Sequence, residues 1–291
     1  MKKLRLLIML CMIILLSTTA YANMAAPKTS DIASTITFEK NQEIAVISEI
    51  LNITVTGSTA DIVASYEMKN TTDYSVSTAS MFLSPNIEQG DVQVLCGEDE
   101  LSYTVKSYKL NYDTQITTDD WQYVILTDEA IAGEDDKIDS ITFNIEFDAN
   151  EQKTIVVSYK YALGGYPDYD FNAKKGTIEY YLTPATMWKD FENLTINLHL
   201  DQDMPTIKDS NLPFEKIDTR TYQYVSSELP EENLQITIDE NWFQNIFSTL
   251  RSPYFKMMLV MLSPFIVGTL LIIAFVVWRF LRSRRIKGYR R

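Results

Sequence analysis

The sequence has very few residues of the types that most often do chemistry: two cysteines and one histidine in 291 residues. Cys11 lies in an N-terminal apolar run, so Cys96 is the one cysteine in the rest of the chain. This scarcity excludes an intrachain disulfide beyond that run, and it excludes a zinc site of thiolates and imidazoles. A Ser-His-Asp or Cys-His set would need His199, whose alternation with Leu198 and Leu200 predicts the polar face of a strand instead.

Basic residues are scarce in the central part of the chain. All 39 Asp and Glu lie between residues 23 and 250 with only 14 Lys and Arg, a net charge of −25. This charge argues against nucleic acid and anionic lipid as the main partner. It is compatible with cations, with a basic partner or with solubility alone. A 228-residue region (23–250) without disulfides is also more typical of a bacterial surface protein than of an animal receptor.

Two long apolar runs mark the ends of the chain. The first, Leu6 to Leu16, follows three basic residues and precedes Ala20-Tyr21-Ala22. This pattern predicts a signal peptide over residues 1–22. A membrane span is the alternative, but the run is too short for one.

The second run, residues 257–278, contains no charged residue and predicts a transmembrane helix. The tail 279–291 carries seven Lys and Arg, against two at the other flank of the run. Positive charge stays on the cytoplasmic side, so we expect a single-pass cell-membrane protein with a cytoplasmic C-terminus and residues 23–250 outside. Trp278, Arg279 and Arg282 are expected to anchor its inner boundary.

Residues 241–256 are predicted to form an amphipathic juxtamembrane helix. Its apolar side chains are spaced along one helical face, at Trp242, Phe243, Ile246, Phe247 and Leu250. We expect this face to lie in the membrane interface with Trp242, Phe243 and Phe247 as anchors. The alternative is that it packs against the outer domain.

Between these ends the dominant pattern is alternation of apolar or aromatic residues with polar ones, interrupted by turn clusters. In residues 153–162, for example, Ile155, Val157, Tyr159 and Tyr161 fall on one face. Short strands at this spacing predict a mainly β protein with a β-sandwich ectodomain.

A break rich in turn residues at 164–172 predicts two modules. They are a β-sandwich domain over 33–163 and a smaller β module over 164–240, after an extended lead-in at 23–32. One elongated sandwich is the alternative.

The loop at the break contains a weak calcium candidate. Asp168, Asp170, Asn172 and Glu179 occupy positions 1, 3, 5 and 12 of a calcium-loop template. Position 6 is Ala173 rather than glycine, so an EF-hand is rejected. Another kind of calcium site remains open beside an ordinary Asp/Asn turn, and no other cofactor is predicted.

The same loop is also aromatic. Tyr166, Tyr169 and Phe171 lie in it, with Trp188 near in sequence. Exposed together, they would form a platform for a sugar ring or a protein partner. We expect these rings to pack in the core instead, with the platform as the alternative.

Several short stretches carry a resemblance to a known group of proteins. They are Asn23-Met-Ala-Ala-Pro27, Ile36-Thr-Phe-Glu-Lys-Asn41, Tyr66-Glu-Met-Lys-Asn-Thr-Thr72, Tyr180-Tyr-Leu-Thr-Pro184 and Met187-Trp-Lys189. The chain resembles uncharacterised bacterial surface proteins, mostly Gram-positive, with a signal peptide, a β-rich ectodomain and one C-terminal transmembrane helix. The resemblance implies that topology and no catalytic residues.

Three functional hypotheses follow. The leading one is a membrane-anchored, non-enzymatic extracellular protein that binds a protein or cell-envelope component. The second is a carboxylate-dependent or calcium-dependent carbohydrate-active enzyme at the cell surface, because paired acids are abundant. The third is an accessory subunit of a membrane complex that assembles through its transmembrane helix.

Overall fold

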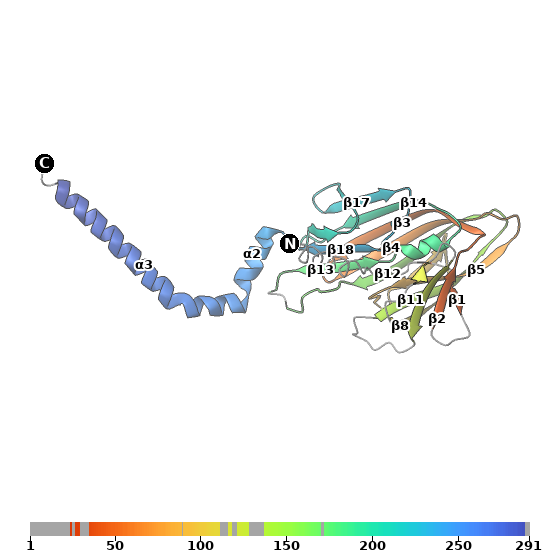
Figure 1. Ribbon diagram of the computed structural model, residues 1–291, viewed down its shortest axis with the longest axis horizontal. Coiled ribbons are helices and arrows are strands. Elements are labelled where there is room, and N and C mark those ends of the chain that lie inside the picture. The colour runs from red at the N-terminus through yellow and green to blue at the C-terminus, as the bar shows by residue number, and fades with distance from the viewer. Residues whose placement is uncertain are drawn as a thin grey trace, which may run out of the picture. The chain divides into compact units, whose positions relative to one another are not determined.

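The computed structural model describes residues 24, 27–29, 35–88, 90–110, 116–117, 121–127, 137–169 and 172–288. Within them, the strands form three sheets (Figure 1). The protein is therefore mainly β and ends in a long apolar helix, as the sequence pattern predicted. The predicted signal peptide lies outside the described residues.

The largest sheet has eight strands in the order β16-β17-β14-β3-β4-β12-β6-β7. Its strands are β3 (Ile44–Thr56), β4 (Thr59–Asn70), β6 (Gln93–Cys96), β7 (Asp99–Glu100), β12 (Gln152–Ala162), β14 (Phe191–His199), β16 (Glu215–Lys216) and β17 (Thr221–Ser226). All neighbours are antiparallel except β14 and β3, which are parallel. The β3–β4 hairpin turns at Gly57, whose φ of 59° lies in the left-handed region that favours glycine.

The other two sheets are smaller. The second contains β1 (Pro27–Thr29), β2 (Thr35–Glu39), β5 (Val76–Ser84), β8 (Tyr103–Leu110), β9 (Ile116–Thr117), β10 (Trp121–Thr127) and β11 (Lys137–Phe147). The third has the order β13-β18-β15 and contains β13 (Lys175–Tyr180), β18 (Leu234–Asp239) and β15 (Thr206–Ser210).

Both smaller sheets pack against the inner face of the eight-stranded sheet. On β12, Ile155, Val157, Tyr159 and Tyr161 are buried, which confirms the predicted face. The Tyr159 ring meets Phe82 of β5 at 5.3 Å between centroids. The third sheet joins the same core, and the result is a β-sandwich with one contiguous hydrophobic core.

The predicted division into two modules is corrected by the strand pairing. Although the third sheet is built entirely from residues after 164, β14 and β17 belong to the eight-stranded sheet with β3 and β4. The boundary at 164 therefore crosses a sheet rather than separating two domains. Local alternation missed this because it does not say which strands will pair.

The predicted lead-in at 23–32 is also corrected. Pro27–Thr29 forms strand β1 and pairs with β2. Met24 is fully buried, and its carbonyl accepts a hydrogen bond from the Trp188 indole N–H at 3.1 Å. Met24 thus joins the core, because the distant Trp188 provides the hydrogen bond for its buried carbonyl.

Two helices end the described chain, α2 (Trp242–Arg251) and α3 (Pro253–Gly288). Helix α2 begins with a capping box, in which Asn241 and Gln244 each accept the other's backbone N–H, at 3.0 and 3.1 Å. The structure thus confirms a helix within 241–256, while α3 extends beyond both ends of the predicted span 257–278.

The described residues divide into two compact units. The β domain lies within Met1–Tyr166 and Lys175–Asp239, and the C-terminal unit lies within Pro167–Lys174 and Glu240–Arg291. In the C-terminal unit, Glu240 Oε1 accepts the Lys174 N–H at 2.9 Å, and Glu240 Oε2 accepts the Ser248 hydroxyl at 2.7 Å. Lys174 is therefore linked to α2 through Glu240.

Candidate functional site

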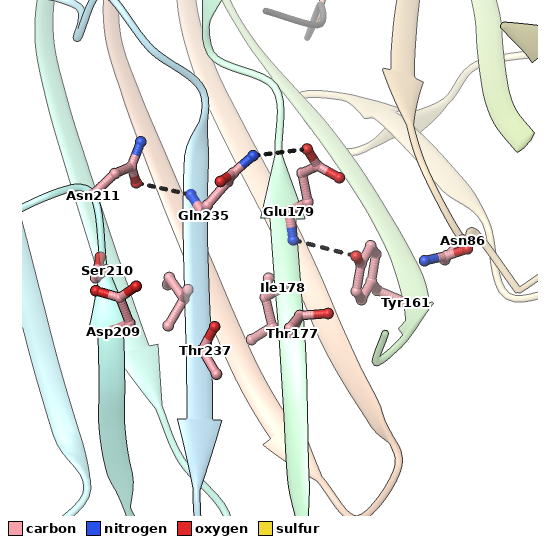
Figure 2. Close-up of a pocket in the computed structure, with 11 residues that line it drawn as sticks. Asn86, Tyr161, Thr177, Ile178, Glu179, Asp209, Ser210, Asn211, Gln235 and Thr237 are labelled. Carbon is pink, nitrogen blue, oxygen red and sulfur yellow. Dashed lines mark hydrogen bonds between the residues drawn. The ribbon is translucent and has the colours of Figure 1, made fainter. Parts of the chain in front are cut away.

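A polar pocket of about 500 Å³ lies on the outer face of the three-stranded sheet (Figure 2). The alternation that buries Ile178 and Ile236 on the inner face places Glu179 and Gln235 on the outer one. Tyr161 from β12 and Asn86 contribute one side. We call this site the sheet-face pocket.

Two rows of polar side chains cross the sheet beneath the pocket. The first is Thr177, Thr237 and Asp209, which are partners in the strand register. The second runs from Glu179 to its partner Gln235 and on to Asn211, whose Oδ1 accepts the Gln235 N–H at 2.9 Å. Side chains from three separate strands therefore converge on one surface.

A β-bulge in β15 determines which side chain completes the first row. Ile207 pairs with Ile238 and Asp209 with Thr237, so Lys208 is an extra residue between them. In a regular strand Lys208 would face Thr237 and Asp209 would turn inward. The bulge instead places the Asp209 carboxylate at the pocket, while Lys208 Nζ pairs with Asp239 Oδ2 at 3.6 Å.

Glu179 is the most buried acid of the pocket. Gln235 Nε2 donates to Glu179 Oε1 at 3.3 Å, and the Glu179 backbone N–H donates to the Tyr161 hydroxyl at 3.2 Å (Figure 2). Partial burial raises the pKa of the Glu179 carboxyl, while the Gln235 hydrogen bond offsets part of the effect. Burial also raises the pKa of Tyr161 to about 12, so its hydroxyl stays protonated at neutral pH.

The chemistry of the site favours binding of hydrogen-bond donors. Of the described residues that line it, two are carboxylates, several carry hydroxyls or amides, and none is cationic. Glu179 and Asp209 stand on the outer strands with β18 between them and belong to different rows, so strand and residue spacing place their Cα atoms about 12 Å apart. This spacing is wider than the ~5 Å of a retaining glycosidase pair.

The structure describes part of the calcium candidate. Glu179 belongs to the sheet-face pocket and is bonded to Gln235, while Asp170 lies outside the described residues. The Asn172 N–H donates to the Tyr169 carbonyl at 3.0 Å, as in an ordinary turn. Among the described residues, no group of three or more His, Cys, Asp and Glu is placed to hold a metal ion.

At Trp188 the structure confirms the expected packing in the core and not the alternative platform. This side chain is 1% exposed and packs in the core, where its indole N–H also donates a hydrogen bond to the Met24 carbonyl. Tyr166 is partly buried against the same core, Tyr169 is 60% exposed, and Phe171 lies outside the described residues. Turn residues around an aromatic cluster do not reveal which rings the rest of the fold will cover.

The predicted membrane anchors lie on exposed helical surfaces. Trp242 and Phe243 have ring centroids 3.8 Å apart, and Phe247 is exposed on the following turn. In α3, the Arg282 guanidinium lies over the Trp278 ring at 5.2 Å, and Arg279 precedes it in the same turn.

Sequence analysis missed a buried carboxylate inside the β domain. Glu49 of β3 is 0% exposed, and its Oε1 accepts a hydrogen bond from the Tyr180 hydroxyl at 2.7 Å. The Tyr66 hydroxyl lies 2.9 Å from the Tyr180 hydroxyl. Burial and the nearby Glu49 raise the pKa of Tyr180, which keeps it a donor. The alternation that places Leu51 and Ile53 inward also places Glu49 there, so a local signal existed. The network joins two sheets and is structural.

The lone histidine and cysteine lie away from the pocket. His199 Nδ1 is 3.1 Å from the Thr221 hydroxyl on the exposed face of β14 and β17. Cys96 is half-buried, and burial raises the pKa of its thiol, which makes it less reactive.

Comparison with known proteins shows the fold. No protein-family model matches the chain, and no curated protein matches its sequence. A proposed nutrient binding protein from Legionella pneumophila has a similar structure, with a TM-score of 0.50, 12% identity, and coverage of 80% of this chain and 78% of that one.

Parts of two enzymes match more loosely. Yeast LTA4 hydrolase matches with a TM-score of 0.34 and 12% identity, over 69% of this chain and 31% of that one. An M1 zinc metallopeptidase from Deinococcus radiodurans matches with a TM-score of 0.30 and 6% identity, over 69% of this chain and 43% of that one. The class defined so far is a β-sandwich protein with one C-terminal helix long and apolar enough to span a membrane.

Proposed function

We propose that this chain is a single-pass membrane protein that displays its β domain outside the cell and binds there, without catalysing a reaction, a protein or cell-envelope component. The observation that carries the proposal is the sheet-face pocket. Its floor is assembled from three strands, and a β-bulge lies at its edge. Bulges often re-aim side chains next to functional sites.

The helix α3 supports membrane anchoring. An 18-residue window within residues 253–279 has a mean hydropathy of 2.6, and none of that window is buried. The hydroxyls of Ser263 and Thr269 donate to the carbonyls of Val260 and Phe265, so they are satisfied within the helix. The basic residues after the span support a cytoplasmic C-terminus.

The helix α2 supports a second contact with the membrane. None of its residues is buried, and Trp242, Phe243 and Phe247 are 58 to 64% exposed. Because this capped amphipathic helix is separated from α3 by one residue, Ser252, its apolar face suits the interface, where aromatic rings are favoured.

The orientation is tested with protease added to intact cells. We expect loss of the β domain and protection of a C-terminal epitope tag. Cleavage of the tag from outside would overturn the proposed topology.

Binding is tested with a variant that fills the pocket. Thr237→Trp places a large ring between Glu179 and Asp209 on the pocket floor, and Thr54→Trp makes the same change on the exposed face of β3 as a control. Full-length protein in nanodiscs should retain cell-envelope components when it carries Thr54→Trp and lose them with Thr237→Trp. Retention by both variants would contradict binding at the pocket.

A further inference from the structure

We infer that the sheet-face pocket recognises a primary ammonium group on a small, hydroxyl-bearing ligand, such as an amino sugar. This inference rests on the proposed function, because it names the ligand of the same pocket. Three features carry it: the sign of the pocket's charge, the acceptors that remain open, and the row of hydroxyls.

The side chains that line the pocket give it a negative charge. Glu179 and Asp209 both line the pocket, and no described lining residue is cationic. The nearest lysine in the sequence, Lys208, is turned to Asp239 by the bulge. An anionic ligand would meet two carboxylates and no cation in the pocket lining, whereas an ammonium group would form charge-assisted hydrogen bonds with either carboxylate.

The acceptors at Glu179 are only partly used. Gln235 Nε2 donates to Oε1 alone, at 3.3 Å, so Oε2 and the Gln235 Oε1 atom retain acceptor capacity. The raised pKa of Glu179 reflects a carboxylate that has lost part of its hydration without gaining a cation. A ligand ammonium would replace the missing charge partner.

The row of hydroxyls indicates what the rest of the ligand is. Thr177 and Thr237 stand side by side in the register, next to Asp209. Hydroxyl and carboxylate groups in a row can exchange hydrogen bonds with the several hydroxyls of a sugar ring. The volume of about 500 Å³ lies within the range of small-molecule sites.

The wider charge distribution favours the same ligand. The region 23–250 carries a net charge of −25, which attracts cations and raises their rate of encounter. A metal ion is a poorer candidate, because no described group of three acidic, histidine or cysteine side chains is placed to ligate one.

The test uses the full chain in nanodiscs and isothermal titration calorimetry. The probes are a glucosamine trimer, its fully N-acetylated form, and spermidine. We expect the glucosamine trimer to bind about tenfold or more tightly than the acetylated trimer, which lacks the charge. Equal binding of the two trimers would overturn the ammonium inference, and spermidine as tight as the glucosamine trimer would overturn the role of the hydroxyls.

Variants assign any binding to the pocket. Glu179→Gln and Asp209→Asn should each weaken glucosamine-trimer binding by about tenfold. Glu192→Gln, an exposed acid on β14 with the same change of charge, should leave it within about twofold. Equal weakening by Glu192→Gln would show general charge attraction and overturn the site.

The two proposals fail in different ways. If no amine binds but Thr237→Trp still abolishes retention of envelope components, the ligand class is wrong and the proposed function stands. If Thr237→Trp changes nothing, binding at the pocket is wrong as well.

Discussion

The β domain and the C-terminal unit use the same apolar residue types in opposite ways. In the β domain, Leu198 and Ile62 are 0% exposed, whereas in α3 Leu271 and Ile272 are each 65% exposed. A soluble domain removes such side chains from water by folding over them. A helix that leaves them all exposed needs another apolar medium, which supports the proposed placement of α3 in lipid.

The two units also differ in how their backbones are satisfied. Strand β14 pairs with β3 across 145 residues, as between Asn197 and Asn52. Helix α3 forms its hydrogen bonds within itself, which is the condition for crossing a bilayer alone. A substitution of a single buried side chain should therefore lower the stability of the whole β domain, whereas a substitution in α2 or α3 should change only that helix.

The largest expected effect is loss of a core leucine. Leu198→Ala should lower the free energy of unfolding of the β domain by about 2 to 5 kcal/mol, because it removes buried methyl groups and leaves a cavity. The same substitution at the exposed Leu250 of α2 should change it by less than ~0.5 kcal/mol. Denaturant unfolding measures both, and equal losses would contradict the distinction between the units.

A charge introduced into α3 should impair membrane insertion and leave the stability of the β domain unchanged. Leu271→Arg adds about 3 kcal/mol to the cost of membrane insertion and should shift protein from the membrane to the soluble fraction. The unfolding midpoint of the β domain should not change. Leu271→Ala is the control for the loss of the leucine side chain. If Leu271→Arg stayed in the membrane fraction as fully as Leu271→Ala, the result would argue against insertion of α3.

The same tryptophan-to-phenylalanine substitution in each unit gives a matched pair with a smaller expected effect on stability. Trp188→Phe leaves the buried Met24 carbonyl without its indole donor and should cost about 1 to 3 kcal/mol of β-domain stability. Trp242→Phe, on the exposed face of α2, should leave that stability within ~0.5 kcal/mol. An undiminished unfolding free energy for Trp188→Phe would show that Met24 does not depend on this hydrogen bond.

Removing the cap of α2 should affect only that helix. Asn241→Ala deletes the acceptor for the Gln244 N–H and should destabilise α2 by about 1 kcal/mol, seen as faster amide hydrogen exchange in its first turn. Asn245→Ala, within the helix, is the control and should not accelerate exchange.

The smallest effect is a gain of stability at the pocket. The raised pKa of Glu179 means that folding disfavours its ionised form, so Glu179→Gln should be slightly more stable than wild type at pH 7. As the pH falls through the raised pKa, the wild-type carboxyl becomes neutral and the difference should vanish. Thermal unfolding from pH 7 to 4 without ligand measures this, and a less stable variant at pH 7 would indicate a structural role.

Local pattern was enough to predict several parts of the molecule. The inward face of β12 at Ile155 and Val157 followed from alternation, and the helix at Trp242 to Leu250 followed from its spacing. Both depend on neighbours within a few residues, which is the range over which side-chain periodicity operates. Placement of Glu49 on the inner face was available from the same signal.

The sheet-face pocket could not be predicted in this way. It depends on pairing of β13, β18 and β15, on Tyr161 from another sheet, and on the one-residue shift that aims Asp209 outward. The burial of Met24 and Trp188 likewise depends on contacts between residues 164 positions apart.

By itself, the sequence determined the strand at 153–162, the helix at Trp242 to Leu250, the acidic balance of the central region and the apolar length of α3, because each follows from local composition and period. Only the tertiary structure decided that strands on both sides of residue 164 share one sheet and that the N-terminal stretch closes the core. It also decided that two carboxylates from separate strands face one pocket. Strand partners and bulges depend on the combined packing of distant segments, and no short window of residues contains that information.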